Sequence, residues 1–492
     1  MQITLSKSKY LIGLRCPKLL WCHYNARELI PPTDEATQAI FDQGHEVGDL
    51  AKKRYPKGVE VKWENGFNQT LKLTKEWVQQ KKTIFEASFV YKNTYCRVDI
   101  LLPINDEWDI IEVKSGTKVK DEHYHDVAFQ RYCLEGAGLK IRQCHLMHIN
   151  NEYVKHGKID PHHIFTCKDI SEEVTGLLST VEENIRKMVA IIQSKTIPLP
   201  TLGVECTDPK TCDVCLTGLP ENNVTQLYRI GNRAYSLINQ NIFLIQHIPD
   251  DFVLNDKQQI QKKCTLINKP SIQKTAIHKF LEHFQYPLHF LDFETVNPAI
   301  PLFDGTRPYQ QIPFQFSLHI VKKRGDKSQL VEFLADSPSD PRSEVLQALK
   351  AIGPTGTVIA YNMIFEKNVL SDLLKVYPCE KWISSVIERL DDLIIPFRNF
   401  WYYHPAQHGS CSIKAVLPAL TGRSYEHLEV NKGDQAAREF LAMMYQGGKK
   451  DMKKLRAALR DYCKQDTEGM IEIFDVLEKA TVDATSERRE CN

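Results

Sequence analysis

The 492-residue sequence has no strong excess of charge of either sign and no long hydrophobic run. Its 63 lysines and arginines almost balance 62 aspartates and glutamates, so the formal net charge is +1. This balance excludes a protein that binds nucleic acid through a basic surface all around it. Any such binding must come from local basic patches, such as residues 52–54 and 449–454, although charged runs of this kind are more often solvated surface.

Targeting signals are also missing. No stretch approaches the length of a transmembrane helix, and residues 1–6 lack the charged and then apolar pattern of a signal peptide. We therefore expect a cytoplasmic protein with no membrane partner. In a reducing compartment its 14 cysteines are not expected to form disulfides, so a cluster of them indicates a bound metal.

The length predicts several domains, because one hydrophobic core rarely supports so many residues. A hydrophobic content of 42% and a charged content of 25% argue against disorder. Helices followed by strands are predicted in the N-terminal half and alternating strands and helices in the C-terminal half, so we expect a multidomain α/β protein. We expect an N-terminal domain over residues 1–216, a helical connector over 217–285, a C-terminal domain over 286–480 and a tail over 481–492.

The C-terminal half is organised around the predicted strand at residues 290–295, Phe-Leu-Asp-Phe-Glu-Thr. Because side chains alternate along a strand, Asp292 and Glu294 point to the same side. Two unpaired carboxylates on one face of a buried strand repel each other and lose their hydration. A divalent cation relieves both costs, and oxygen ligands suit magnesium or manganese.

Two later motifs add acidic residues to this half. Glu366 lies four residues after Asn362 at a predicted helix start, and Tyr462 and Asp466 lie four apart on one face of a predicted helix. Taken singly, a Tyr–Asp contact at this spacing usually only decorates a helix. Three apolar stretches predict further strands at residues 312–321, 330–334 and 357–361.

Together these motifs resemble, in order, those of the DnaQ-like DEDDy exonucleases, which have an RNase H-like fold. The resemblance implies two magnesium or manganese ions held by Asp292, Glu294, Glu366 and Asp466. It implies that Tyr462 positions the attacking water. Glu366 departs from the family pattern, which usually has aspartate there. Asp391 or Asp392 is the alternative ligand, although a solvated pair at a strand end is the preferred interpretation.

Two loops of the C-terminal half are candidates for substrate binding. Arg307 and Tyr309 follow the strand that carries Asp292, and they can grip a phosphate and stack on a terminal base. Lys414 lies in a second candidate phosphate-contacting loop at residues 409–414. Both loops are equally typical of structural turns.

The N-terminal half contains its own acidic group. Three strands are predicted at residues 85–91, 95–102 and 108–115, the first two joined by a hairpin. They carry Asp99 and, on one face of the third strand, Glu112 and Lys114. Such carboxylates can hold a divalent ion while the lysine orients water or stabilises charge on a phosphate. The alternative is a surface Glu–Lys pair of little consequence.

The pattern of Asp99, then Glu112-Val113-Lys114, resembles the signature of the PD-(D/E)XK nuclease superfamily. Ser6, Ser8, Cys16-Pro17 and a helical His45 ahead of the strands resemble its RecB-like branch. The resemblance implies His45, Asp99 and Glu112 as metal ligands, Lys114 as the catalytic lysine and Gln130 as a helical residue of the site. The branch often has tyrosine four residues after this glutamine, where the chain has Leu134, and Tyr132 lies on a different helical face.

Three cysteines within ten residues, Cys206, Cys212 and Cys215, lie in a loop rich in turn residues. Loops do not bury small hydrophobic residues, so these thiols predict a soft-metal site that needs a fourth ligand. In iron–sulfur members of the RecB-like branch, one cysteine precedes the nuclease core and three follow it. This resemblance implies a 4Fe-4S cluster on Cys16, Cys206, Cys212 and Cys215. Zinc is the alternative metal, and Cys22, Cys144 and Cys167 are alternative fourth ligands.

The combined layout resembles that of bacterial proteins of unassigned function with a RecB-like and a DnaQ-like domain. The leading hypothesis is a metal-dependent nuclease that hydrolyses single-stranded or end-containing DNA at one site and trims 3′ ends at another. One alternative is a nucleic-acid-binding scaffold in which one or both folds are inactive. The other is an RNA exonuclease, because metal ligands recognise a phosphodiester and not the sugar.

Overall fold

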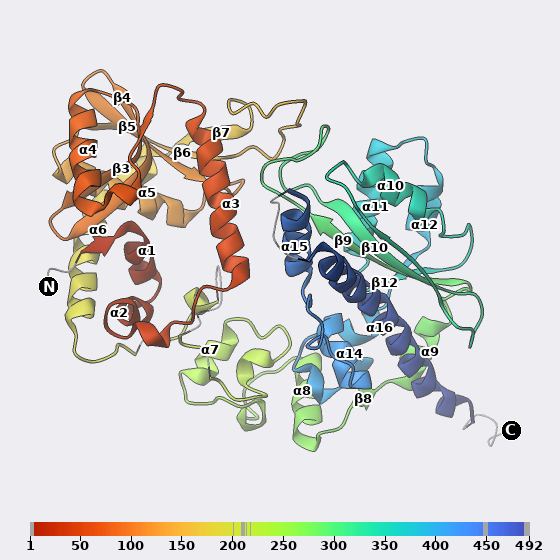
Figure 1. The fold of residues 1–492 in the computed structure, drawn as a ribbon. Coiled ribbons are helices and arrows are strands. Elements are labelled where there is room, and N and C mark those ends of the chain that lie inside the picture. Colours follow the sequence, from red (N-terminus) through yellow and green to blue (C-terminus); the bar gives the residue numbers. More distant parts are fainter. Residues whose placement is uncertain are drawn as a thin grey trace. The chain divides into compact units, whose positions relative to one another are not determined.

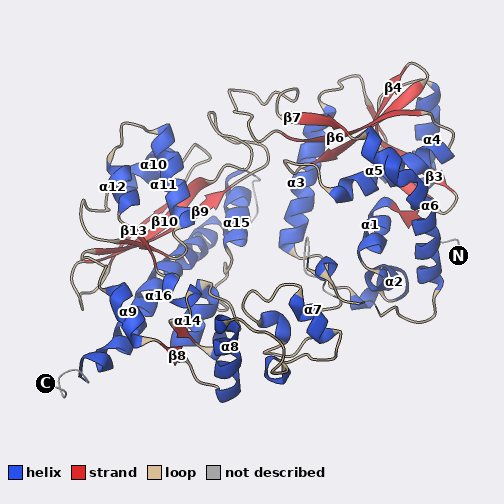
Figure 2. Cartoon of the chain, turned by 180° about the vertical axis from the view of Figure 1, so that it is seen from behind, coloured by secondary structure: helices blue, strands red, loops and turns tan. Residues whose placement is uncertain are grey.

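A computed structural model describes residues 4–199, 201–207, 212, 214–216, 218–445 and 451–486. The chain divides into two compact units (Figures 1 and 2). The first unit contains residues 1–218 together with Pro298–Gln310. The second contains Leu219–Asn297 and residues 311–492.

The first unit is built on a mixed β-sheet with helices packed on it. Its strands are β1 (Leu5–Ser6), β2 (Val59–Glu60), β3 (Ile84–Tyr91), β4 (Thr94–Ile104), β5 (Glu107–Lys114), β6 (Ile141–Ile149) and β7 (Phe165–Asp169). Its α-helices are α1 (Lys7–Arg15), α2 (Pro17–Asn25), α3 (Glu35–Lys52), α4 (Phe67–Gln79), α5 (Asp121–Gly136) and α6 (Ser171–Gln193). Short 3-10 helices are η1 (Arg27–Leu29), η2 (Trp63–Asn65) and η3 (Val204–Cys206).

Seven described strands form this sheet in the order β2-β3-β4-β5-β6-β7, with β1 paired to β4. The pairs β3–β4, β4–β5 and β6–β7 are antiparallel, whereas β5–β6 is parallel. Alternate residues face two apolar clusters: Ile110 packs in a cluster with the α5 residues Val127 and Phe129, whereas Ile111 packs with Val47 of α3. The sheet therefore lies between α5, backed by α6, and α3.

Residues 298–310 extend this unit although they follow a strand of the other. Ala299, 1% exposed, belongs to the apolar cluster of Val47 and Ile111. Asp304 forms an ion pair with Lys155, and the Lys155 backbone N–H donates to the carbonyl of Thr306 at 3.0 Å. The segment is thus a packed part of the first unit.

The second unit has a five-stranded sheet and a small two-stranded one among its described residues. Its strands are β8 (Ser271–Ile272), β9 (Leu288–Val296), β10 (Ile312–Val321), β11 (Gln329–Leu334), β12 (Val358–Ala360), β13 (Leu390–Asp392) and β14 (Tyr402–Tyr403). Its α-helices are α7 (Arg233–Ile238), α8 (Asp256–Ile267), α9 (Lys274–Leu281), α10 (Arg342–Leu349), α11 (Ile364–Val376), α12 (Trp382–Glu388), α13 (Ile395–Arg398), α14 (Ile413–Thr421), α15 (Gly433–Tyr445) and α16 (Met452–Ser486). The 3-10 helices are η4 (Val224–Gln226), η5 (Ile245–His247) and η6 (Pro405–Gln407).

The larger sheet of the second unit has the strand order β11-β10-β9-β12-β13. β9, β10 and β11 are antiparallel, and β12 and β13 continue parallel to β9. On one face Leu291 and Phe293 pack with α10, α11 and α12. The long helix α16 crosses the other face and contacts β9, β10 and β11 (Figure 1). Side chains that alternate with Leu291 and Phe293 therefore face α16.

Local chemistry explains the first helices. Ser6 caps α1 by accepting the Lys9 backbone N–H at 3.4 Å, and Pro17 occupies the first turn of α2, where its missing N–H costs nothing. The predicted strands around Asp99 and Asp292 are confirmed as β4 and β9.

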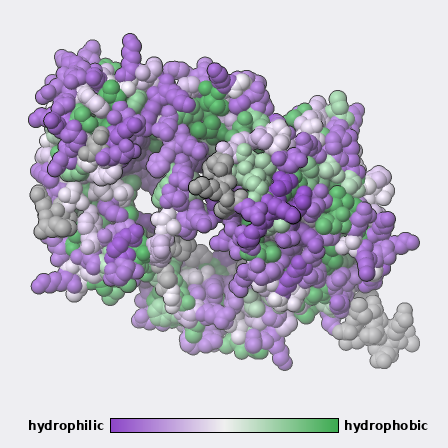
Figure 3. Space-filling view, viewed as in Figure 1, coloured by the Kyte–Doolittle hydropathy of each residue, from purple (hydrophilic) through white to green (hydrophobic). Residues whose placement is uncertain are grey.

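The chain is thus a multidomain α/β protein. Its compact units depart from the predicted boundaries in two places, because residues 219–285 fold with the second unit and residues 298–310 with the first. None of the described helices is long and apolar enough to cross a membrane. Hydrophilic residues cover most of the face seen in Figure 3, with smaller hydrophobic patches between them.

Candidate functional site

Three acidic side chains meet on the α16 face of the second unit. Asp292 and Glu294 lie on β9 between the core residues Leu291, Phe293 and Val296, and Asp466 lies on α16. One ligand oxygen from each acid lies within 4.8 Å of the others. This spacing allows one divalent cation to contact all three.

Burial and mutual repulsion favour the protonated forms of these acids. Burial raises the pKa of Glu294 to about 8, and Asp466 adds to the rise. Burial also raises the pKa of Asp466 to about 6. Burial, then Asp466 and Glu294, raise the pKa of Asp292 well above its ordinary value. A cation would stabilise the charged forms, so the site has the electrostatics of a cation site.

Glu366 borders the same acidic group. It lies in the first turn of α11, is 2% exposed, and its Oε2 has no hydrogen-bond partner among the described residues. Burial raises its pKa to about 8, with smaller contributions from Asp392 and Asp466. A buried carboxylate oxygen without a partner is costly, and a bound cation would satisfy it.

Asp392 corrects the expectation of a solvated pair at this strand end. It is buried at the end of β13, and its Oδ1 accepts the backbone N–H groups of Asn362 at 2.8 Å and Ile394 at 3.1 Å. These bonds hold the turn that leads to α11. Asp391 is half-buried and accepts the Asp392 N–H at 2.8 Å. Asp392 therefore has a structural task, and Glu366 remains the acid nearest the group.

Lys414 lies in the first turn of α14, not in the predicted loop, and its side chain reaches the acidic group. Its Nζ donates to the Tyr462 hydroxyl at 3.0 Å and to the Asn431 carbonyl at 2.8 Å. The same ammonium lies 5.0 Å from the Tyr462 ring centroid and lowers the pKa values of Glu294 and Asp466. Lys414 thus holds Tyr462 beside the carboxylates, and its contact with a phosphate stays a prediction.

Two neighbours of this group were not predicted from the sequence. The Tyr425 hydroxyl donates to Asp466 Oδ1 at 2.5 Å, and the Cys463 thiol donates to Asp292 Oδ2 at 3.4 Å. Cys463 follows Tyr462 on the predicted helix, so the sequence could have indicated that it lies near the acidic group. Tyr425 comes from a loop with no motif, and only the tertiary structure brings it here.

A second acidic group lies in the first unit. β4 and β5 pair as Ile100 with Ile111, which brings Asp99 level with Glu112. Asp99 Oδ2 accepts the backbone N–H of Val113 at 2.8 Å. Burial, followed by repulsion from Glu112, raises the pKa of Asp99 to about 7. The predicted pairing of these two acids across adjacent strands is therefore present.

Both oxygens of Glu112 are occupied by donors of the chain itself. Lys114 Nζ and Lys7 Nζ donate to Oε1 at 2.7 and 2.8 Å, and the Gln130 amide donates to Oε2 at 2.8 Å. Lys114 also donates to Asp126 Oδ2 at 2.7 Å. Sequence reasoning found Lys114 and Gln130 but missed Lys7 and Asp126, although Lys7 lies within the Ser6-x-Ser8 motif.

These lysines change the electrostatics of the first site. Burial alone would raise the pKa of Glu112, but Lys114 and Lys7 lower it far below its ordinary range. Burial alone would lower the pKa of Lys7, but Asp126 and Glu112 raise it well above its ordinary value. Glu112 is therefore a stable carboxylate in this arrangement, and a metal ion would have to compete with two ammonium groups for it.

His45 does not join this site. It is exposed on α3, and the structure does not gather His45, Asp99 and Glu112 within 4.8 Å of one another. The buried residues of α3 are Val47, Leu50 and Ala51, all near its C-terminal end. The predicted ligand role of His45 is therefore not visible in this arrangement.

Three of the four predicted cluster cysteines converge. Cys16, the N-cap of α2, hydrogen-bonds through its side chain with Cys212 and Cys215. Contacts with Cys16 and Cys215 lower the pKa of Cys212, whereas contacts with Cys16 and Cys212 raise that of Cys215. Cys206 lies next to them, because its carbonyl accepts the Cys212 N–H at 2.6 Å.

The alternative fourth ligands differ in position. Cys22 is buried on α2 and is affected by the charge of Cys212. Cys144 is buried in the core on β6, and Cys167 is exposed on β7. Of the three alternatives, Cys22 is thus the one linked to the cluster.

Arg307 and Tyr309 belong to the first unit, which corrects their expected place beside β9. The Tyr309 hydroxyl donates to the carbonyl of Ser115, directly after Lys114, and its ring packs against the apolar cluster of α3. Arg307 is exposed and lines an open pocket of about 530 Å³ with Gly116 and Asn151. The tethered Tyr309 therefore has a structural role, while Arg307 stays accessible.

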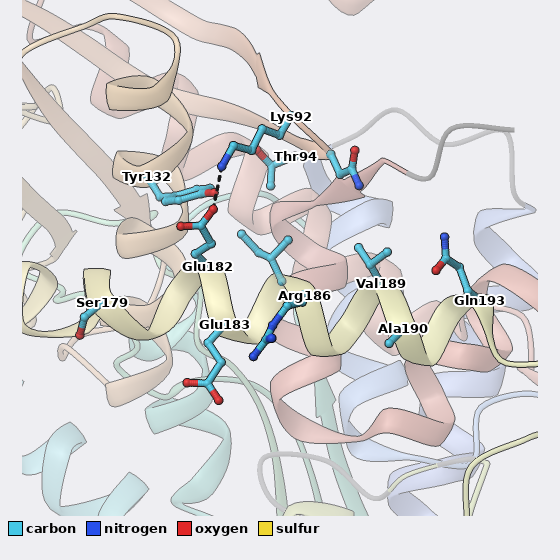
Figure 4. A pocket seen from close by; sticks show the side chains of 12 residues that line it. Lys92, Thr94, Tyr132, Ser179, Glu182, Glu183, Arg186, Val189, Ala190 and Gln193 are labelled. Atoms are coloured by element: carbon cyan, nitrogen blue, oxygen red, sulfur yellow. Dashed lines mark hydrogen bonds and ion pairs between the residues drawn. The ribbon is translucent and has the colours of Figure 1, made fainter.

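A larger open pocket, of about 980 Å³, follows α6 in the first unit (Figure 4). Lys92 and Glu182 form an ion pair of 2.7 Å across it, and Tyr132 lies beside Glu182. None of the predicted metal ligands lines this pocket. Tyr132 thus points into this pocket while Gln130 contacts Glu112, in agreement with their different helical faces.

Comparison with known proteins gives partial matches. A family model described as "Domain of unknown function (DUF2779)" matches residues 289–412. The chain is 29% identical over 207 residues to an uncharacterized protein of Mycoplasma pneumoniae, covering 37% of this chain and 31% of that protein. It is 24% identical over 205 residues to an uncharacterized protein of Mycoplasma genitalium, with the same two coverages.

The chain thus spans about a third of the length of these curated relatives. The matched family segment contains Asp292, Glu294 and Glu366, and it ends before Lys414 and Asp466. The family match therefore covers three of the four acids that form the acidic group of the second unit.

Proposed function

We propose that this protein is a metal-dependent nuclease whose main catalytic site is the acidic group of the second unit. The observation that carries the proposal is the approach of Asp292, Glu294 and Asp466 within 4.8 Å, with the buried Glu366 beside them. The cationic side chains of the protein do not balance the charge of these four carboxylates. Hard divalent ions stabilise such an arrangement.

The topology of the second unit supports this proposal. The strand order β11-β10-β9-β12-β13, with three antiparallel strands followed by two parallel ones, is the order expected for an RNase H-like fold. The carboxylates lie on the first strand, β9, and on the last long helix, α16, as in the DnaQ-like resemblance. Fold likeness alone does not establish an activity, so the site chemistry carries the argument.

The donor set fits magnesium or manganese. Asp292, Glu294, Glu366 and Asp466 would hold the metal, which when bound supplies an activated water and offsets charge on a phosphodiester. Tyr462, held by the Lys414 ammonium, would orient that water through its hydroxyl. Tyr425 would hold Asp466 in place through its hydrogen bond.

We propose a second, PD-(D/E)XK-like nuclease site in the first unit. Asp99 and Glu112 offer oxygen ligands, and Lys114 would stabilise charge on the phosphate. Because Lys7, Lys114 and Gln130 occupy Glu112, metal binding requires some of these bonds to be exchanged. The first site should therefore bind metal more weakly than the second.

The cysteine group fits a soft metal. The side chains of Cys16, Cys212 and Cys215 contact one another and Cys206 adjoins them, so all four would serve as thiolate ligands. We propose a 4Fe-4S cluster, with zinc as the alternative. A brown colour and metal analysis of protein purified without oxygen separate the two.

The test compares wild type with Asp292→Asn, Glu112→Gln and the double variant on labelled single-stranded DNA, duplex DNA and RNA. With magnesium or manganese, wild type should degrade the strand that suits it, and Asp292→Asn should remove most of that activity. An Asp372→Asn variant is the matched control, because it changes a half-buried acid of α11 whose ion-pair partner is the exposed Lys375. Intact substrates of every form with both metals would refute the proposal.

One observation favours a partly inactive protein. The lysine-filled environment of Glu112 is also what a degenerate nuclease site would contain, so the second candidate function of the first unit is a nucleic-acid-binding scaffold. In that case Glu112→Gln leaves cleavage unchanged, and binding by the first unit is salt-sensitive but independent of metal. RNA in the substrate panel tests the RNA exonuclease alternative.

A further inference from the structure

An exposed aromatic group lies on the first unit, near the start of β4. Trp63 and Phe67 are 50% and 41% exposed, and Tyr95 is half-buried beside them. Their ring centroids are separated by 6.5 Å for Trp63–Phe67, 6.3 Å for Trp63–Tyr95 and 5.2 Å for Phe67–Tyr95. Single exposed apolar residues are ordinary, but three clustered rings with open faces indicate a binding surface.

The surrounding backbone holds these rings in place. Val61, fully buried, anchors the chain just before Trp63, and its N–H donates to the Phe85 carbonyl at 3.0 Å. Gly66, at φ 78°, makes the turn between Trp63 and the start of α4 at Phe67. The rings are therefore ordered before any ligand binds, which lowers the entropic cost of binding.

An arginine completes the group. The Arg97 guanidinium lies 5.6 Å from the Trp63 ring centroid, and its Nη2 pairs with Glu86 at 3.0 Å. Its Nε is buried and has no hydrogen-bond partner within the described part of the chain. Aromatic rings with an adjacent arginine are the combination that proteins use to stack nucleobases of single strands.

The group is connected to the first acidic site along β4. Tyr95, Arg97 and Asp99 alternate with the buried Cys96 and Val98. At about 3.3 Å per residue, Tyr95 lies roughly 13 Å along the strand from Asp99. Glu86, the partner of Arg97, is also close enough to Asp99 to act on it, after burial and Glu112, in raising its pKa. A short single strand stacked on the rings can therefore reach Asp99.

We propose that Trp63, Phe67 and Tyr95, with Arg97, form a stacking platform for an unpaired nucleobase of a single strand that enters the first site. Bases within a duplex present no free face to these rings, so the platform selects single strands and frayed ends. This inference rests on the proposed nuclease function, whose substrate form it names. Binding to the platform itself requires no metal.

The test measures binding in the presence of a chelator, so that cleavage plays no part. The probes are a labelled oligothymidylate, an abasic strand of the same length and a blunt duplex. Trp63→Ala and Phe67→Ala should each weaken oligothymidylate binding by roughly 5- to 100-fold and change binding of the abasic strand by less than about twofold. Leu29→Ala, which removes an equally exposed apolar side chain of the same unit, should leave all three unchanged.

Fluorescence adds a readout that a structural role would not give. Oligothymidylate should quench part of the tryptophan emission of the wild type, and Trp63→Phe should lose that quenching while keeping most of the affinity, because phenylalanine also stacks. Equal weakening for the base-bearing and abasic strands, or no weakening at all, overturns the platform. If Trp63→Ala does not fold, Phe67→Ala decides alone.

The outcome is separable from that of the nuclease assay. Base-dependent binding that depends on Trp63, in a protein that cleaves nothing, would refute the proposed activity and leave the platform standing. Cleavage of single strands by a protein whose platform variants bind as the wild type does would refute the platform alone.

Discussion

The two acidic groups differ in how the charge of their buried carboxylates is balanced. In the first unit Asp99, Glu112 and Asp126 are accompanied by two lysines, Lys7 and Lys114. In the second, four acids share Lys414 as the one close ammonium among the described residues. The charge of the first group is largely neutralised by the chain itself, whereas that of the second group is not.

The difference shows in the pKa values. Lysines lower the pKa of Glu112, whereas burial and neighbouring acids raise those of Glu294 and Glu366 to about 8. A site that carries its own cations folds readily without metal. Under the proposed function, a site without them would draw part of its stability from the bound metal.

The largest expected effect concerns the residue that departs from the exonuclease pattern. Glu366→Gln should reduce cleavage at the second site by roughly 10²- to 10³-fold, because it removes a negative ligand from the transition-state environment. Glu366→Asp should retain activity within about tenfold, since a carboxylate remains. Steady-state cleavage rates measure both. Equal loss in both variants would show that the length of the side chain, rather than its charge, is essential.

Removing a cation from the first group should produce the next largest effect. Lys7→Ala leaves Glu112 and Asp126 with one ammonium fewer in a buried setting, which should lower the free energy of unfolding by about 3 kcal/mol. Urea unfolding measures the change. Lys72→Ala, which breaks an exposed i,i+4 pair on α4, should cost less than about 0.5 kcal/mol. Similar values for the two variants would contradict the role assigned to Lys7.

Neutralising an acid of the second group should raise the free energy of unfolding, whereas Lys7→Ala should lower it. Without metal, Asp292→Asn relieves repulsion by Asp466 and Glu294 and should raise the free energy of unfolding by about 1 kcal/mol. With magnesium at 100 times its dissociation constant, the wild type should gain about 2.7 kcal/mol and the variant almost nothing. Thermal unfolding with and without metal measures this. A gain of equal size in Asp292→Asn would place the metal elsewhere.

The smallest expected effect is the pH dependence of stability without metal. Because the folded pKa values of Glu294 and Asp466 are raised, the folded protein keeps protons that the unfolded chain releases. The free energy of unfolding should therefore fall by about 1–2 kcal/mol as the pH rises from about 5 to 8.

Glu112 contributes in the opposite direction. Its lowered pKa gives stability that is present above the ordinary glutamate range and is lost as the pH falls below about 4. Urea unfolding across pH should thus show a maximum on the acidic side of neutrality. A shallower decline in Glu294→Gln than in the wild type would assign the decline to the second group, because that variant removes one of the two raised pKa values.

Strand period and helix spacing were enough to predict most members of the two acidic groups. Alternation along β9 and β5 pairs Asp292 with Glu294 and Glu112 with Lys114, and the four-residue spacing on α16 pairs Tyr462 with Asp466. Residues reached only through tertiary folding were missed. The sequence around Lys7 and Tyr425 does not indicate that they contact Glu112 and Asp466. Nor does it indicate that Asp392 is buried and accepts the Asn362 N–H.

The segment Pro298–Gln310 was placed wrongly for the same reason. Adjacency to β9 in sequence suggested a role near Asp292, whereas Ala299 and Tyr309 pack in the first unit. The surface on which a loop packs depends on which apolar residues the rest of the fold leaves exposed. The local sequence of the loop carries little information about those residues.

This segment has a practical consequence for anyone who would divide the protein. A fragment ending at residue 218 lacks Ala299 and the Tyr309 tether to Ser115, so part of its hydrophobic interior would open to solvent. A fragment beginning at residue 219 would carry the same thirteen residues with no surface of its own unit to rest on. The two halves are thus continuous in sequence but interleaved in folding, and they are best produced as one polypeptide.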